Sequence, residues 1–511
     1  MTLENYIVRD LTALPPDGLT GRTKIKTTAS QITAENVVDV VNEALATHSV
    51  NAAQISYLYN YYCGRQDVLN KTKLVRENIN NKVIVNRANE IVTFKSAYIL
   101  NGPIQYISAG GKEDVSKKVN ALNEYMRSED KASKDKEIID WMHICGVGVR
   151  LVLDDKDMEE EDGAPFCIYT LDPRSAFVIY RDYIGEPPIA GVILQRNENQ
   201  EWYADVYTKD SHFVIKDGEV VLNHPSQYGG IPLIEYINNE ARMGAFESVL
   251  PILNGINTLE SNAIDSVEDF VNGFDVFQNC EIADGEYSQL ALGGKAVKIK
   301  TVTQGMEAKV YRIASELSQS GAQTRIDDLT DAYLTICGMP NRNGGSSTSD
   351  TGTAVIYRDG WGEAESRAQD TETMFKRSER SMLRIVLRIC EIAQSGKYDI
   401  GLKLSDVKPE FLRKNLSNLQ SKVQVLCELL NNPKVHPKLA FEAACLFKDN
   451  EEAYRMSSEY YEGYLANEEK KLEAELENAR AEALRAGGSN DQGTEQDGGQ
   501  TGAEKQAETA D

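Results

Sequence analysis

Apolar residues recur at helical spacing in the first part of the chain, in stretches separated by Gly, Pro and Asn clusters. The spacing predicts helices over residues 34–45, 88–100 and 115–145. The second should end at Asn101-Gly102-Pro103, because this triplet breaks helices. A Tyr-rich segment, residues 51–69, follows the first helix, and we expect its rings to pack in a core or, alternatively, in a subunit interface.

From Val147 onward the apolar period changes to two, which is typical of strands. We expect eight strands, over residues 147–153, 166–171, 176–180, 190–195, 201–207, 212–215, 220–223 and 233–237. The acidic run 154–162 is interpreted as a solvated hairpin tip and not as a metal site, because consecutive carboxylates cannot all face one ion. Helices and strands together make this part α+β.

Helical spacing returns over residues 244–274, where Pro251 should either kink the helix or mark its true start. A β-like insert over residues 276–312 and a second helix over residues 315–336 follow it. The second helix runs into Cys337-Gly338-Met339-Pro340, where Gly and Pro should stop it.

A loop without a single apolar side chain, residues 341–352, separates this helix from a longer one over residues 353–393. The longer helix would measure about 60 Å. A polar loop between two long helices makes sense if it projects into a space and touches something that moves. The long helix carries a heptad stripe, which favours a subunit contact or a bundle core over a cofactor site. Its members are Trp361, Ala368, Phe375, Met382 and Ile389.

The C-terminal part is expected to be helical and then to lose structure. Helices are predicted over residues 409–416, 417–430, 437–447 and 450–464. From Asn467 the chain becomes charged and then rich in Gly, Gln and Asp, which predicts a solvated helix to Arg485 followed by a disordered tail.

Composition limits the classes of protein that remain. A length of 511 residues predicts more than one domain, and 41% apolar residues suffice for cores. No stretch approaches the roughly 20 apolar residues that cross a bilayer. The eight cysteines are scattered, which favours reduced, buried thiols. A net charge of −24 argues against wrapping nucleic acid, but an acidic wall lets nucleic acid slide past without sticking.

Motifs for nucleotide, metal or hydrolytic chemistry are missing. The nearest approach to a phosphate-binding loop, Gly293-Gly294-Lys295-Ala296, lacks the first glycine and the hydroxyl that would bind Mg²⁺. The five histidines are far apart, and no nucleophile-elbow motif is present. We therefore expect no cofactor and no enzyme. Long helices with narrow apolar stripes suit a subunit of a ring closed by heterologous contacts.

Six segments stand out, in order, over roughly residues 50–395: Tyr61-Tyr62-Cys63-Gly64-Arg65-Gln66-Asp67-Val68-Leu69, Asn80-Asn81-Lys82-Val83-Ile84-Val85-Asn86, Ala97-Tyr98-Ile99-Leu100-Asn101-Gly102-Pro103-Ile104, Gly230-Ile231-Pro232-Leu233-Ile234-Glu235-Tyr236, Gly244-Ala245-Phe246-Glu247-Ser248-Val249 and Thr351-Gly352-Thr353-Ala354-Val355-Ile356-Tyr357-Arg358. In this order they resemble the portal protein family of long-tailed (siphovirus-type) double-stranded DNA bacteriophages. One difference is Thr351-Gly352, where the family often has Ser-Gly at the start of the long helix.

The resemblance implies an α+β portal fold and a homo-oligomeric ring of about twelve subunits at one capsid vertex of the virion, assembled in the host cytoplasm. Double-stranded DNA would pass through its channel. The implied partners are the terminase large subunit, the head–tail adaptor, and the major capsid and scaffold proteins, with no membrane. The implied parts are an N-terminal arm (1–50), a wing (51–239), a first stem helix (240–274), a clip (275–312), a second stem helix (313–339), a tunnel loop (340–353), a long helix from wing to crown (354–395), a helical crown (396–466) and an acidic, largely disordered tail (467–511).

Three groups of residues are candidates for function. In the tunnel loop, Arg342 would contact DNA phosphates. The alternative is that Arg342 caps the preceding helix or pairs with a neighbouring subunit. In the clip, the lysines would contact DNA or an acidic partner, or form a solvated edge that blocks aggregation. The loop candidates are Asn341, Arg342, Asn343, Ser346, Ser347, Thr348 and Ser349; the clip candidates are Lys295, Lys298 and Lys300; the candidates for subunit packing are Trp361, Phe375 and Met382.

Two other classes of protein stay open. One is a coiled-coil capsid or scaffold component without a channel, which should form open or fibrous assemblies. The other is a virion-associated enzyme with an unrecognised site, which should be active as a purified monomer. A portal protein should instead form closed rings.

Overall fold

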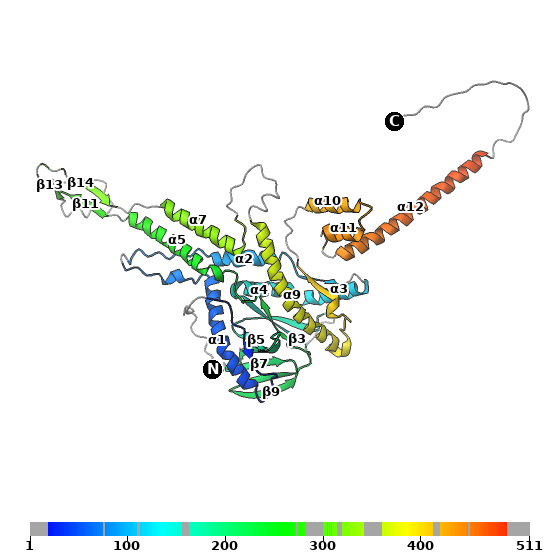
Figure 1. Cartoon of the computed structure of the whole chain (residues 1–511), viewed down its shortest axis with the longest axis horizontal. Coiled ribbons are helices and arrows are strands. Elements are labelled where there is room, and N and C mark those ends of the chain that lie inside the picture. The colour runs from blue at the N-terminus through cyan, green and yellow to red at the C-terminus, as the bar shows by residue number, and fades with distance from the viewer. Residues whose placement is uncertain are drawn as a thin grey trace, which may run out of the picture. The chain divides into compact units, whose positions relative to one another are not determined.

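The structure is a computed structural model, and it divides into two compact units, Met1–Asn418 and Leu419–Asp511. Figure 1 shows the course of the chain. The structure describes residues 19–74, 77–109, 113–155, 163–199, 201–271, 274–281, 300–303, 305, 307, 309–313, 319–341, 360–411, 419–444, 446–447 and 450–487.

A six-stranded sheet with the order β1-β5-β6-β7-β8-β9 lies at one side of the first unit. Only the β1–β5 pair is parallel, and the remaining pairs are antiparallel. Because side chains alternate along a strand, one face of this sheet packs on helix α1 (Val37–Tyr62) and the other on a second sheet. The strands are β1 (Lys26–Thr27), β5 (Ala176–Arg181), β6 (Pro188–Arg196), β7 (Trp202–Thr208), β8 (Ser211–Lys216) and β9 (Glu219–Pro225).

The second sheet is antiparallel with the order β10-β3-β4, from β10 (Leu233–Ile237), β3 (Val147–Asp154) and β4 (Phe166–Leu171). All eight strands expected between residues 147 and 237 are confirmed. The β3–β4 hairpin pairing is also confirmed, whereas residues 156–162 of its acidic connection lie outside the described residues.

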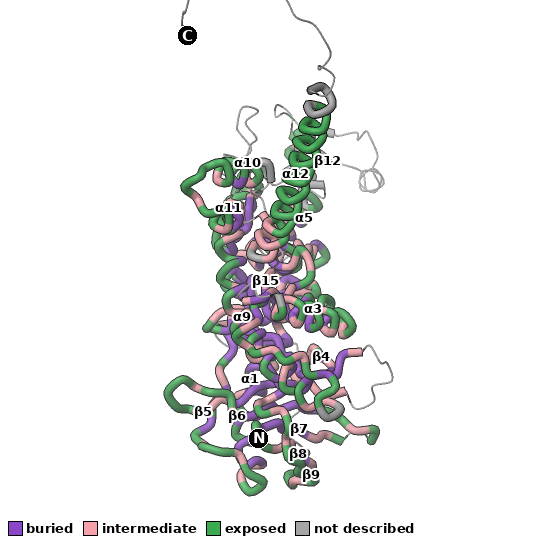
Figure 2. The backbone as a smooth tube through the Cα atoms, turned by 90° about the vertical axis from the view of Figure 1, so that its right-hand side faces the viewer, coloured by how far each residue is buried: buried purple, intermediate pink, exposed green. Residues whose placement is uncertain are grey.

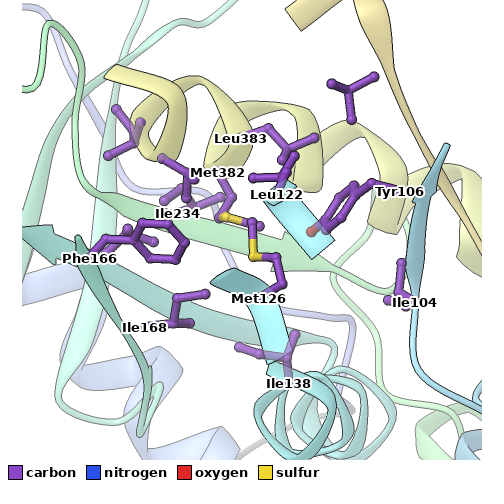
Figure 3. Close-up of a cluster of buried hydrophobic side chains, with 14 of the residues drawn as sticks. Ile104, Tyr106, Leu122, Met126, Ile138, Phe166, Ile168, Ile234, Met382 and Leu383 are labelled. Carbon is purple, nitrogen blue, oxygen red and sulfur yellow. The ribbon is translucent and has the colours of Figure 1, made fainter. Parts of the chain in front are cut away.

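Helices cover the far face of the second sheet and complete a four-layer arrangement of helix, sheet, sheet and helices. Val152 and Ile168 of the sheet pack there against Met126 of α3 (Glu113–Ser128), Ile138 of α4 (Lys131–Cys145) and Met382 of α9 (Trp361–Ile392). Figure 3 shows this core. It joins segments more than 200 residues apart.

The prediction of one continuous helix over residues 115–145 is wrong. It divides into α3 and α4 at Asp130, whose φ of 46° places it in the left-handed region that ends helices. The prediction over residues 88–100 is confirmed by α2 (Arg87–Ile99), and the helix over 34–45 continues through the Tyr-rich segment as α1.

Two further helices, α5 (Leu250–Val271) and α7 (Gln319–Cys337), flank a small β region. Pro251 lies in the first turn of α5, so it marks the true start of the helix, where its missing N–H costs nothing. The β region consists of the pairs β11–β14 and β12–β13, and short 3-10 turns occur at residues 67–70, 247–249, 393–396 and 404–406. The strands are β11 (Phe274–Gln278), β12 (Cys280–Glu281), β13 (Lys300–Thr301) and β14 (Lys309–Ile313).

The last strand of the first unit pairs with a strand from much earlier in the chain. Strand β15 (Val407–Glu410) pairs antiparallel with β2 (Gln105–Ser108), so the helix predicted over residues 409–416 is wrong at its start. Residues 412–418 lie outside the described residues.

The second unit contains α10 (Leu419–Leu430), α11 (Pro437–Ala444) and α12 (Asn450–Gly487). Leu426, Phe441 and Tyr454 join the three helices in a small core. Beyond this core α12 is exposed along most of its length, as Figure 2 shows.

Candidate functional site

Helices α5 and α7 lie side by side and are the first part of the candidate site (Figure 1). Leu253 and Ile256 of α5 are buried in one cluster with Tyr333, Leu334 and Cys337 of α7. α5 leads into β11 and β14 leads to α7, and β11 pairs with β14. The two helices and this ladder therefore form one helical hairpin.

An extended segment, residues 81–85, lies along α5 and is called the α5 belt. The backbone N–H groups of Asn81, Val83 and Val85 donate to side-chain oxygens of Asp265 (2.7 Å), Ser261 (2.9 Å) and Asn257 (2.8 Å), respectively. Alternate amides of an extended chain are about 6.6 Å apart and helical residues four apart are about 6.0 Å apart, so the two spacings match. The side-chain oxygens of α5 thus accept the backbone hydrogen bonds that a neighbouring β-strand would otherwise accept from the belt.

Lysines reinforce the belt at its outer end. Lys71 and Lys73 place their ammonium groups 2.8 Å and 2.6 Å from Oδ2 of Asp265, which is 2% exposed. Burial raises the pKa of Asp265, but the hydrogen bonds from Lys71, Lys73 and Asn81 outweigh burial and lower the pKa well below its usual value. The carboxylate of Asp265 therefore stays charged and holds Lys71, Lys73 and the α5 belt against α5.

The end of α7 is fixed by a Schellman motif. The N–H of Met339 donates to the carbonyl of Leu334 (2.8 Å), and the N–H of Gly338 donates to that of Thr335 (3.1 Å). Gly338 has a φ of 63°, which glycine adopts at little cost. Leu334 and Met339 are both buried, as the motif requires. The helix therefore stops for a local reason, before the polar loop begins.

The chain returns to the same place at the start of α9. A Cβ placed on Gly360 would lie 3.7 Å from the carbonyl oxygen of Met339 and 3.7 Å from Cα of Pro340, while a Cβ on Gly338 would meet Arg367 of α9 at 2.8 Å. The amide of Asn341 donates to Asp331 of α7 (2.8 Å). Gly360 at the start of α9 therefore lies beside Met339 and Pro340 at the end of α7.

Most of the predicted loop and clip residues lie outside the described residues, namely Arg342, Asn343, Ser346, Ser347, Thr348, Ser349, Lys295 and Lys298. Of the remaining candidates, Asn341 lies at the end of α7, and Lys300 lies in β13 opposite Glu281 of β12.

The candidates for subunit packing lie inside the chain's own fold. Phe375 and Met382 are 0% exposed in the core under α9, so of the two alternatives predicted for the heptad stripe, a subunit contact or a bundle core, these two residues have core contacts within one chain. The cause is the packing of α9 on β10, which no local pattern reveals. Trp361 packs against Phe94 and Tyr98, with ring centroids 6.1 Å and 6.2 Å apart.

A group of four buried charges, Lys131, Asp135, Arg150 and Glu379, holds α9 in place and is called the buried ion cluster. The ammonium of Lys131 lies 2.6 Å from Asp135 and 2.8 Å from Glu379, and Arg150 lies 2.8 Å from Asp135. Burial raises the pKa of Glu379, but Lys131 and Arg150 outweigh burial, so the net pKa is lowered. Two cations balance two anions.

Two tyrosine hydroxyls complete the cluster. Tyr236 of β10 donates to Oε2 of Glu379 at 2.6 Å, and Tyr106 of β2 donates to Oε1. Glu379 therefore ties α9 to α4, β2, β3 and β10 at once. It fixes the helix that follows the loop.

Sequence reasoning missed the belt and the cluster, although each left a signal. Asn257, Ser261 and Asp265 recur every four residues along one side of α5, and Glu379 interrupts the apolar face between Phe375 and Met382. A polar residue on a buried face needs a partner. The partner could not be identified from the sequence, however. Glu379 is 143 residues from Tyr236 and 273 residues from Tyr106 along the chain.

Among the residues that the structure describes, no group of three or more His, Cys, Asp or Glu side chains is placed to hold a metal ion. Within the same residues, no helix combines the length and the apolar character needed to cross a membrane.

Comparison with known families assigns the chain. A family model described as "Phage portal protein, SPP1 Gp6-like" matches residues 42–479 of the 511. A search of curated proteins gives no match. Because the family model covers most of the chain, including α5, α7, α9 and the segment between α7 and α9, the chain belongs to the phage portal protein family.

Proposed function

We propose that about twelve copies of the chain form the ring and that residues 340–353 are the tunnel loop that meets DNA in its channel. A phage portal protein occupies one capsid vertex of the virion and is the passage for DNA during packaging and ejection. Each subunit would then present one loop, carrying Arg342, to the passing duplex.

One observation supports this role most: the chain leaves α7 and re-enters α9 beside Pro340. Both helices are fixed, α7 by its packing on α5 and α9 by the buried ion cluster. The sequence that joins these two fixed helices, residues 342–359, is polar up to Gly352. A rigid base is what a loop needs if it is to hold its place against moving DNA.

We further propose α5 and α7 as the stem helices and residues 275–312 as the clip. The clip, with Lys295, Lys298 and Lys300, would face the terminase large subunit during packaging and the head–tail adaptor afterwards. Major capsid and scaffold proteins are the other proposed partners. Members of the family are structural proteins, and we propose no reaction and no cofactor for this chain.

The test removes residues 343–349 from the loop. The deletion should leave ring assembly unchanged and reduce the amount of DNA packaged or retained per particle. Replacing the same residues by a Gly/Ser segment of equal length separates loop length from loop chemistry. Normally filled particles from the deletion variant would refute the role of the loop, and a wild-type chain that forms no ring would refute the proposed function as a whole.

A further inference from the structure

A groove of about 620 Å³ lies between α9 and the two sheets. Arg377, Ser381 and Arg384 of α9 line one wall, and Tyr180 and Ile189 of the six-stranded sheet lie opposite. Strand β10 runs along its floor. No part of the site described above uses this groove, called the α9 groove.

The floor of the α9 groove is the open edge of β10. This strand is the last in the order β10-β3-β4, so only one of its edges is paired. Hydrogen bonds from Val152 N–H to Pro232 O and from Asn238 N–H to Gly146 O (3.0 Å each) show that even-numbered residues face β3. The backbone groups of residues 233, 235 and 237 therefore point the other way, toward the groove that these residues line, where the carbonyl of Glu235 already accepts a hydrogen bond from the Ser378 hydroxyl of α9 (2.8 Å). An open strand edge accepts an extended segment.

The walls of the α9 groove are cationic although the chain carries a net charge of −24. Five cations, Lys24, Lys209, Arg242, Arg377 and Arg384, line it against three carboxylates, Asp210, Glu235 and Glu240. On α9, every exposed position from 377 to 388 is an arginine, at 377, 380, 384 and 388. These spacings place all four on one helix face over about 16 Å.

One ion pair at the rim of the groove is easily exchanged. Arg377 lies 2.7 Å from Glu240, and the two side chains are 65% and 71% exposed. Such exposed pairs contribute little, so an incoming carboxylate can replace Glu240 at small cost. The groove thus suits an extended, acidic segment.

The chain's own sequence holds such a segment in the connection between β3 and β4. Residues 154–162 read Asp-Asp-Lys-Asp-Met-Glu-Glu-Glu-Asp, with seven carboxylates and one lysine. Strand β4 is at the opposite edge of the sheet from β10. A ring closed by heterologous contacts needs two different, complementary patches on each subunit. Resting on the proposed ring, we infer that the α9 groove of one subunit binds the acidic β3–β4 connection of its neighbour.

A disulfide test addresses the contact directly. Ser381→Cys lies in the groove and Glu160→Cys in the acidic connection, both in a chain whose exposed Cys63 and Cys427 are changed to Ser. Oxidation of assembled rings should give a covalent ladder up to the full ring only when both new cysteines are present. A crosslink confined to single chains, or no crosslink in intact rings, would overturn the inference.

Charge reversal tests the electrostatics. Arg377→Glu with Arg384→Glu should raise the subunit concentration for half-assembly roughly tenfold or more, because like charges then meet at the contact. Reversing Glu159, Glu160 and Glu161 to Lys should do the same, and combining both sets should restore assembly.

Matched controls are Arg127→Glu on α3 and the exposed acids Asp114, Glu124 and Glu219 changed to Lys, which should assemble normally. Rings that form normally from both reversed chains would overturn the inference, as would a loss of DNA binding without a loss of rings, which would assign the arginines to nucleic acid. If the wild-type chain forms no ring, the proposed function fails instead.

Discussion

Replacing Glu379 by Gln tests the buried ion cluster. The substitution keeps the shape of the side chain and removes its charge, which leaves Lys131 and Arg150 facing Asp135 alone, a net buried charge of +1. Breaking a buried pair costs about 3–5 kcal/mol when it leaves a charge uncompensated. The two tyrosine hydroxyls also lose a charged acceptor, which points to the upper part of this range.

Urea unfolding followed by tryptophan fluorescence measures this loss without interference from the second unit. All three tryptophans, Trp141, Trp202 and Trp361, belong to the first unit. The exposed Glu391 of the same helix, paired with Arg388, provides a control: Glu391→Gln should change the free energy of unfolding by less than about 0.5 kcal/mol.

A double-mutant cycle with Lys131→Met sharpens the test. In the double variant Arg150 still balances Asp135, so its loss should be smaller than the sum of the two single losses, by roughly 1–3 kcal/mol. A Glu379→Gln variant within about 0.5 kcal/mol of wild type, or strictly additive losses, would show that these charges do not act as one cluster.

Three further predictions concern pH, the α5 belt and the end of α7. Burial lowers the pKa of His143 to about 3, so the unfolded chain binds a proton below about pH 6.5 that the folded chain refuses, and stability should fall from there to about pH 3. In His143→Gln this part of the urea-measured pH dependence should disappear, and an unchanged slope would contradict it. Asp265→Asn should free the belt and increase proteolytic cleavage at residues 71–85, whereas Ser266→Ala on the exposed side of α5 should not. Gly338→Ala should cost about 1–2 kcal/mol, because an L residue at this φ is strained, and a thermal shift no larger than that of Gly463→Ala would oppose the assignment.

The sheets were predictable from the sequence because alternation is a local property. Of the eight strands between residues 147 and 237, some, such as β7 and β8, show a period of two, and others, such as β5, are short apolar runs bounded by turn residues. The end of α7 was equally local, since Gly338 and Pro340 mark it. The break at Asp130 also left a local signal that the prediction overlooked, because Asp is a common N-cap residue and Ala132 is the single apolar residue between 127 and 137.

The candidate site was predictable only in outline. The polar loop and the long helix after it are visible as composition and as a heptad. That residues 341 and 360 meet at Pro340 is a contact through space, and no pattern within either helix encodes it. Phe375 and Met382 illustrate the same limit, because a heptad stripe does not tell a contact within one chain from a contact between chains.

Electron microscopy of the purified full-length chain, at several protein and salt concentrations, is the decisive measurement for the proposed channel. We expect closed rings with an axial channel, in which α7 and α9 direct residues 342–359 toward the axis. Monomers at every concentration, open filaments, or closed rings in which these residues face outward would contradict it.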